Sequence, residues 1–281
     1  MKRRPGPVVA SWLVLALLAL AAAAGLFTSS PEDARCCAAP PSGEHLLGTA
    51  ASGADLGVAV AQGLGTSAAI AVAAAVLALV LGVVWGAAAA LLPPRMETAL
   101  MRAVDVLAAA PYTLFVVTLV VIVRAARPSL PSALDALLDA RLLIVVCVAG
   151  IEWLTLARVV HARIAGLRKR PFIELARSLG MPRRRILRVH VVPHTAGPLA
   201  AYAVLALPGA LAAEGFFSFL GFGVEAPELS LGTLVADGAR AMSVAPLTFL
   251  LPAGVLVAAT VALHVVGAHL RDTLRPERRL R

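Results

Sequence analysis

Few side chains in this sequence have the chemistry of a catalyst. The chain has 281 residues, and its two lysines, Lys2 and Lys169, neither follow a glycine nor precede a serine or threonine. The sequence therefore has no Gly-x-x-x-x-Gly-Lys-Ser/Thr loop, the motif that binds nucleotide phosphates. It also has no His-Glu-x-x-His motif of a zinc hydrolase and no Gly-x-Ser-x-Gly motif of a serine hydrolase. We expect the chain to be no enzyme and to hydrolyse no ATP by itself.

The histidines and cysteines do not have the spacing of a metal site. Cys36 and Cys37 are adjacent, a poor geometry for a mutual disulfide, and Cys147 lies inside an apolar run. Five histidines stand near the ends of apolar runs without a carboxylate at ligand spacing: His161, His190, His194, His264 and His269. Such histidines are more often structural than catalytic. We therefore expect no metal ion and no cofactor.

The carboxylates inside apolar runs are the better candidates for function, because an ionisable group in a lipid-buried segment is costly. Glu152 is the one carboxylate well inside such a run. Two interpretations stay open for it: it faces a water-filled translocation path, or it pairs with Arg158 about two helical turns away. Asp105 and Glu214 lie at the ends of apolar runs, where a solvated, interfacial carboxylate is expected. Glu214 is a second candidate for the path.

The elements that position these groups must be transmembrane helices. Hydrophobic residues make up 60% of the chain and charged residues 15%, with a mean hydropathy of +0.88, against about 45–50% and about 25% in soluble domains. A helix needs about 20 apolar residues to cross the hydrocarbon layer. Six runs qualify, at residues 8–27, 68–92, 104–123, 142–160, 198–213 and 247–267. A further apolar piece at 216–224 is predicted to be re-entrant.

The distribution of positive charge predicts the orientation. With six spans, twenty of the 25 Lys and Arg residues fall on the side of the termini, and five on the other: Arg35, Arg124, Arg127, Arg141 and Arg240. By the positive-inside rule the termini and the long loop from His161 are cytoplasmic. The net charge of +9 is thereby explained as a topology signal, and we expect no nucleic acid partner.

The first run has two interpretations. A basic start at residues 2–4 and small residues at 21–25 are typical of a cleaved signal peptide. The apolar stretch of 8–27 is longer than the 7–15 residues typical of a signal peptide, however, which favours a retained anchor helix.

The basic loop between the fourth and fifth runs is predicted to contain two short helices. Pro171 suits the first position of a helix over 171–179, which is amphipathic, and Gly180 suits its C-terminal cap. A second helix is predicted to start at Pro182 and to end at Pro193. An isolated helix this short is unstable in water, so it needs a docking surface. Lipid headgroups and a partner protein are both consistent with its basic and apolar side chains.

This loop resembles the signature of permease subunits of binding-protein-dependent ABC importers. That pattern reads Glu-Ala-Ala, three residues, Gly, nine residues, Ile-x-Leu-Pro. The matching positions here are Glu174, Ala176, Gly180 and Pro193, while Leu175, His190 and Val192 depart from it. The stretch His-Val-Val-Pro-His at 190–194 is similar to the His-Ile-Leu-Pro-Asn variant of the dipeptide, oligopeptide and nickel branch.

Further segments resemble that branch in the same order along the chain. Residues 47–55 are similar to its Leu-Gly-Thr-Asp-x-x-Gly-Arg-Asp entry into the membrane domain, with Ala54 in place of arginine. Residues 105–111 resemble the opening of its third span, and 214–224 its Glu-x-x-Leu-Ser-Phe-Leu-Gly-Leu-Gly-Val segment. Residues 267–272 resemble its Gly-Asp-Gly-Leu-Arg-Asp ending, with Ala268 in place of the first aspartate. The usual tryptophan near 230–232 is missing, and the external loop at 125–141 is longer than most.

The resemblance implies an all-α membrane protein of the type I ABC importer permease class, with about six transmembrane helices and both termini cytoplasmic. It implies a multi-pass protein of the bacterial inner membrane that moves peptides, or nickel and peptide-like solutes, by alternating access. Its partners would be a second permease subunit, cytoplasmic ATPase subunits, an external solute-binding protein and the lipid bilayer. The alternative is a membrane scaffold whose basic loop docks a partner without transport.

The resemblance also assigns residues and segments. The helix near residue 174 would be a coupling helix that enters a groove of the ATPase. Its coupling residues would be Phe172, Glu174, Leu175, Ala176, Leu179, Gly180, Arg183 and Pro193. Phe172, Leu175 and Leu179 would fill the groove, Glu174 and nearby arginines would make polar contacts, and Gly180 would form the turn. We expect an anchor helix and external loop at 1–63, a permease domain at 64–270 with a coupling loop at 161–197, and a basic tail at 271–281.

Overall fold

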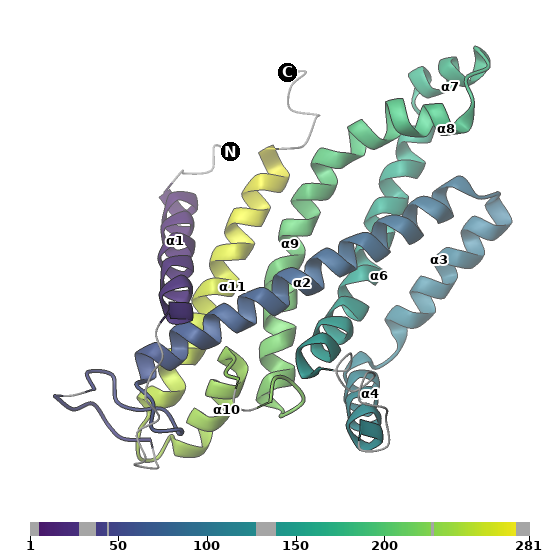
Figure 1. The fold of residues 1–281 in the computed structure, drawn as a ribbon. Helices are drawn as coiled ribbons and strands as arrows, with labels where there is room; N and C mark the ends of the chain where they lie inside the picture. Colours follow the sequence, from purple (N-terminus) through teal and green to yellow (C-terminus); the bar gives the residue numbers. More distant parts are fainter. Residues whose placement is uncertain (1–5, 28–37, 44, 128–138, 226–227, 274–281) are drawn as a thin grey trace.

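The computed structural model describes residues 6–27, 38–43, 45–127, 139–225 and 228–273 (Figure 1). Every long regular element in this part is helical, which confirms the all-α prediction. The helices are α1 (Gly6–Phe27), α2 (Leu56–Leu91), α3 (Pro94–Ala109), α4 (Tyr112–Ala126), α6 (Ala140–Arg168), α7 (Pro171–Ser178), α8 (Arg183–Ile186), a π-helical turn (Leu187–Val191), α9 (Val192–Phe219), α10 (Leu231–Ala241) and α11 (Leu247–Thr273). Cys36 and Cys37 lie outside the described residues.

Five of these helices are long and apolar enough to span a membrane, namely α1, α2, α6, α9 and α11, and the bent pair α3 and α4 brings the total to as many as six. The prediction of about six spans is confirmed, but the straight third span predicted over 104–123 is wrong. The two helices meet at an angle of 81°. Pro111 causes the break, because a residue before proline avoids the helical conformation and Ala110 is extended at ψ 145°.

Two other predicted spans have different limits. The second begins at Leu56 rather than at 68, because Asp55 caps the helix: its Oδ1 accepts from the amides of Gly57 at 2.8 Å and Val58 at 3.2 Å. The fifth, predicted over 198–213, extends as α9 to Phe219. The piece at 216–224 is therefore no separate re-entrant segment. It begins as the last turn of α9 and leaves it through Gly221, whose φ is +84°.

Helices α2 and α6 form the centre of the bundle because small residues let their backbones approach. Gly82 and Gly86 of α2 face α6, where an added Cβ at Gly82 would lie 2.6 Å from the Cβ of Leu156, and one at Gly86 2.8 Å from the Cβ of Val160. Close packing through small residues drives association of helices in lipid, where the hydrophobic effect between helices is absent. The edge-to-face pair of Trp85 and Trp153, with centroids 5.4 Å apart, extends this contact.

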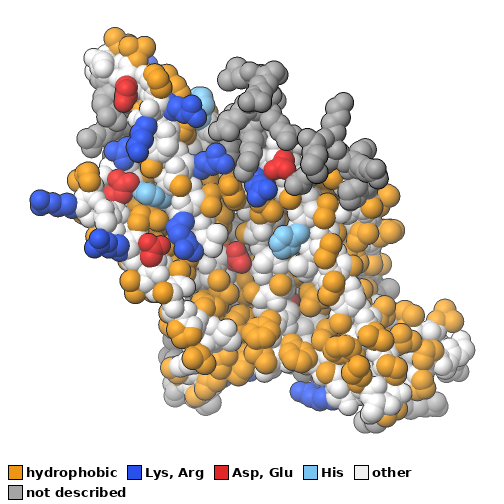
Figure 2. Space-filling view, turned by 180° about the vertical axis from the view of Figure 1, so that it is seen from behind, with side chains coloured by type: hydrophobic (Ala, Val, Ile, Leu, Met, Phe, Trp, Pro, Cys, Tyr) orange, Lys and Arg blue, Asp and Glu red, His pale blue; other side chains and the backbone are white. Residues whose placement is uncertain are grey.

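The two ends of the bundle differ in their elements and in charge. Helices α7 and α8 lie at the same end of the bundle as the start of α1 and the end of α11, and α4 and α10 lie at the other end (Figure 1). Lys and Arg side chains gather over the end that carries α7, while hydrophobic side chains cover most of the remaining face (Figure 2). Together with the positive-inside rule this arrangement supports a cytoplasmic α7, and the orientation itself stays a prediction.

Candidate functional site

Helix α7 has one face fixed to the bundle and one face free. It runs over Pro171–Ser178, within one residue of the predicted 171–179. Ile173 and Ala176 are buried, with 1% and 6% of their surface exposed, whereas Leu175 and Leu179 are 62% and 76% exposed. Two large aliphatic side chains, one on α7 and one directly after it, thus point away from the protein, and the helix is too short to be stable alone.

The fixed face of α7 packs on an apolar cluster that joins several segments. The cluster consists of Ala90 of α2, Val160 and Ile164 of α6, Ile173 and Ala176 of α7, Ile186 of α8 and Val191 at the start of α9. Ala176 therefore faces the bundle rather than the free surface. Through this cluster a displacement of α7 must act on the ends of the neighbouring helices, since close-packed interiors transmit strain.

Gly180 ends α7 in the left-handed conformation, as the sequence predicted. Its φ is +76°. The amide of Met181 donates to the carbonyl of Ala176 at 3.1 Å, which is the bond that closes a Schellman cap. Nothing lies within 4 Å of a Cβ built at this position. The backbone conformation, and not crowding, is therefore what requires glycine here.

The remaining predicted coupling residues do not all lie on the free face of α7. Glu174 is exposed on the free side of α7. Arg183 begins α8 one residue after Pro182, as predicted, but its side chain lies outside the described residues. The prediction that Pro193 ends the second helix is wrong. Pro193 is the second residue of α9, a position that needs no amide donor, so the chain continues into the membrane as one helix.

The loop predicted to begin at His161 is shorter than expected, because α6 continues to Arg168. The last turns of α6 are held to α3 by contacts between polar side chains that the sequence spacing did not reveal. His161 Nε2 lies 2.7 Å from Glu97 Oε1, and an Arg168 Nη1 lies 3.9 Å from Glu97 Oε2. Arg168 also donates to the carbonyl of Ala90 at the end of α2. These contacts fix the end of α6 on which α7 is mounted.

Glu152 lies half-buried in the middle of α6, beside α9. Its Oε1 is close to Gly209, since a Cβ built there would lie 2.6 Å from that oxygen. The proposed pair with Arg158 is not formed: an Arg158 Nη1 lies instead 3.9 Å from Asp105 Oδ1. Of the two interpretations, the ion pair with Arg158 is thus wrong.

Glu214 is fully buried, so the expectation of a solvated carboxylate at a helix end is wrong. The hydroxyl of Ser218 donates to its Oε1 at 2.7 Å, Ser67 and Ser230 lie beside the carboxyl group, and Oε2 has no hydrogen-bond partner among the described residues. Ser67 Oγ in turn accepts from the amide of Leu231, the first residue of α10, at 3.0 Å. Glu214 is therefore the centre of a polar cluster that joins α2, α9 and α10.

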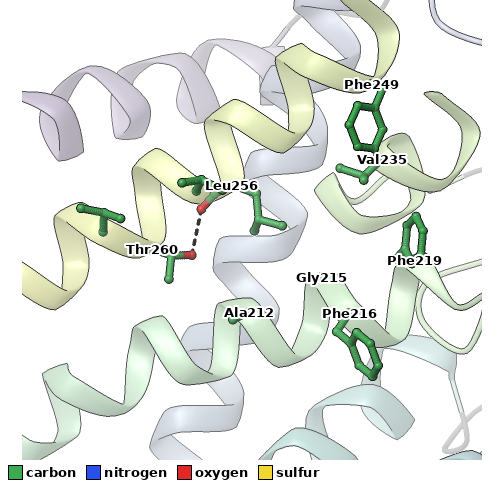
Figure 3. Close-up of a pocket in the computed structure, with 10 residues that line it drawn as sticks. Ala212, Gly215, Phe216, Phe219, Val235, Phe249, Leu256 and Thr260 are labelled. Atoms are coloured by element: carbon green, nitrogen blue, oxygen red, sulfur yellow. Dashed lines mark hydrogen bonds between the residues drawn. The ribbon is translucent and has the colours of Figure 1, made fainter. Parts of the chain in front are cut away.

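The described residues also form an open apolar hollow of about 490 Å³ between α9, α10 and α11. Phe216, Phe219, Phe249 and Leu256 are among the residues that line it (Figure 3). Its one hydroxyl, on Thr260, donates to the carbonyl of Leu256 at 2.8 Å. This pocket offers no free polar group for a polar solute. Among the described residues, no three His, Cys, Asp or Glu side chains are grouped closely enough to hold a metal ion.

Comparisons with known proteins agree with the signature in the loop. A family model described as "Binding-protein-dependent transport system inner membrane component" matches residues 78–271. The chain is 33% identical to the oligopeptide transport system permease protein OppC of Haemophilus influenzae, over 90% of this chain and 78% of that protein. It is 35% identical to the protein of that name in Escherichia coli, over 96% and 87%, and 34% identical to the one in Bacillus subtilis, over 85% and 74%.

Proposed function

This chain belongs to the family of inner membrane components of binding-protein-dependent transport systems, and from that premise we propose that it is one half of a heterodimeric ABC importer permease for peptides. The peptide substrate is inferred from the relatives, which are oligopeptide permeases. The second half is a related permease subunit, and an external binding protein delivers the solute. The observation that carries the proposal is α7, a short helix with a fixed face and an exposed apolar face.

The free face of α7 docks in a groove of a cytoplasmic ATPase. Leu175 and Leu179 supply the apolar contact, because they are the most exposed of the large hydrophobic side chains described in this segment. Burying one such side chain contributes about 1.5–3 kcal/mol. Glu174 and the arginines around it supply polar contacts at the rim. Because the chain has no phosphate-binding loop, the energy for uphill transport comes from this partner.

Transport proceeds by alternating access. ATP draws the two ATPase subunits together and moves α7, and the helices then change from an inward-facing to an outward-facing arrangement. The ATPase shifts this equilibrium only if its ATP-bound form binds the outward state more tightly. A shift from 1:99 to 99:1 requires a difference of about 5.5 kcal/mol between the two states. The apolar cluster beneath α7 supports the mechanism, because it joins α7 to the ends of the neighbouring helices.

Glu152 faces the translocation path, and Glu214 closes its outer end. A carboxylate in the middle of a span is stable only beside water or a polar partner, and Glu152 lies half-buried between α6 and α9. Glu214 contributes by holding α10 against α2 and α9 through its serine neighbours rather than by touching solute in this state. The anchor at 1–63, the permease domain at 64–270, the coupling loop at 161–197 and the tail at 271–281 remain the proposed divisions.

A binding and hydrolysis experiment tests this proposal against a scaffold that docks a partner without transport. The purified complex should show ATP hydrolysis that rises when the peptide-loaded binding protein is added. Leu175→Ser should weaken ATPase binding about tenfold or more, from the loss of one buried leucine. The matched control is Leu91→Ser, an exposed leucine at the same end but outside α7, which should bind as the wild type does. An ATPase that binds but never responds to peptide would support the scaffold instead.

A further inference from the structure

The side chain of Phe172, assigned to the ATPase groove by resemblance, makes an internal contact that the sequence did not predict. Its ring is stacked on that of His194, with centroids 5.6 Å apart and planes 29° apart. The ring of His190 lies beside that of Phe172, tilted by 57° with centroids 6.2 Å apart. Phe172 is on α7, whereas His190 and His194 belong to the π-helical turn and the first turn of α9. The three rings therefore join the coupling segment to the helix that enters the membrane.

The histidine pair is held in place by the backbone of that turn. His194 Nδ1 lies 2.7 Å from the carbonyl oxygen of His190, so that its N–H donates and orients the ring. Thr195 reinforces the same turn, since its hydroxyl lies 2.9 Å from the carbonyl oxygen of Val191. Pro193, between the histidines, has no amide hydrogen, and a π-helical turn ends two residues before it, at Val191. Such turns within long helices are frequent at functional sites.

The contact between Phe172 and the histidines also lies between α7 and α9, where a movement of α7 would be passed to α9. Half-exposed Phe172 stands between the free face of α7 and the start of α9. From there α9 runs without interruption to Phe219 and carries Gly209, beside Glu152, and Glu214, at the junction with α10. Figure 1 shows α7 and α8 at the upper end of α9, which crosses the whole bundle. A movement of α7 passed to α9 would thus reach both interior carboxylates.

We propose that the stack of Phe172 with His190 and His194 is the joint that transmits movement of the coupling helix to α9. This inference rests on the proposed function and adds to it two positioning residues that contact neither solute nor nucleotide. The apolar cluster beneath α7 holds the helix on the bundle, while the stack sets the angle between α7 and α9. Loss of the stack then separates ATP hydrolysis from transport without releasing the ATPase.

The test compares His194→Ala with His194→Phe in the complete complex, reconstituted in liposomes with the ATPase and the peptide-loaded binding protein. Three quantities are measured: ATPase retained on the permease, stimulation of hydrolysis by the loaded binding protein, and peptide imported per ATP. His194→Ala should retain the ATPase and lower peptide imported per ATP about three- to tenfold, the effect expected from losing one aromatic pair. His194→Phe should restore most of this ratio, because it restores a ring that stacks.

A control variant separates the joint from the docking surface. Leu175→Ala removes an exposed contact of α7 that does not belong to the stack, so it should lower the amount of ATPase retained on the permease, the quantity that His194→Ala leaves at the wild-type level. An unchanged ratio in His194→Ala, or no recovery in His194→Phe, would overturn the joint while the proposed function stands. A wild-type complex without peptide-stimulated hydrolysis would overturn the proposed function, and the joint with it.

Discussion

The left-handed conformation of Gly180 allows a graded prediction at the end of the coupling helix. The φ of +76° costs a residue with a Cβ about 1–2 kcal/mol, and asparagine tolerates it better than other residues. Since a Cβ here would meet nothing within 4 Å, this backbone cost is the whole expected penalty for alanine. Valine should cost more, because β-branching restricts the side chain further. The expected order of damage is Gly180→Asn, then Gly180→Ala, then Gly180→Val.

The size of the expected loss of ATP hydrolysis follows from the cap that Gly180 makes at the end of α7. A penalty of 1–2 kcal/mol corresponds to about a 5- to 30-fold change in the equilibrium between the capped turn and its alternatives. Without the turn, the bond from the Met181 amide to the Ala176 carbonyl is lost and α7 is no longer held in one orientation. Peptide-stimulated ATP hydrolysis should therefore fall in the same order, and by up to this factor if the capped turn is required for coupling.

The assay is peptide-stimulated ATP hydrolysis by the purified complex, with Gly166→Ala as the matched control. Gly166 lies in α6, and a Cβ there also meets nothing within 4 Å. In a helix alanine is favoured over glycine by about 1 kcal/mol, so this variant should be at least as stable as the wild type and equally coupled. The reasoning is refuted if the Gly180 variants couple as Gly166→Ala does, or if asparagine proves no better than valine.

Three further predictions concern the interior. Gly86→Ala should destabilise the protein by about 1–3 kcal/mol, because its Cβ would crowd Val160. Thermal unfolding in detergent measures this loss. The control Gly254→Ala, whose Cβ lies in open space on α11, should not destabilise the protein. Glu214→Leu should lower the unfolding temperature more than Glu214→Gln, because glutamine keeps an acceptor for Ser218; equal losses would contradict this role. Glu152→Gln should leave assembly intact and slow peptide uptake, and wild-type uptake would remove Glu152 from the path.

Local features of the sequence predicted the local structure of the coupling segment well. Pro171 and Gly180 mark the two ends of α7 within one residue, because the proline first position and the glycine cap act over a few residues. The break at Pro111 was missed although its cause is local. The hydropathy of the run does not reveal the break, because an apolar segment has the same mean hydropathy whether it is straight or bent.

The environment of the charged groups could not be read from the sequence. Glu214 is buried at a point where Ser67 and Ser230, from distant parts of the chain, lie beside it. Arg158 pairs with Asp105, 53 positions away, rather than with a neighbour on its own helix. The stack of Phe172 on His194 likewise depends on how α9 continues past Pro193, where the sequence predicted an end. Helical periodicity places a side chain on a face, but the neighbouring helix decides what that face meets.

Peptide uptake into proteoliposomes that contain this chain, its partner permease and the ATPase subunits tests the central claim most directly. The account predicts that a labelled peptide accumulates above its external concentration when the loaded binding protein is outside and ATP is inside. It also predicts that accumulation stops when ATP is replaced by a non-hydrolysable analogue. Equal uptake with and without hydrolysable ATP, or no uptake by an assembled complex that hydrolyses ATP, would contradict the claim that α7 couples this permease to an ATPase.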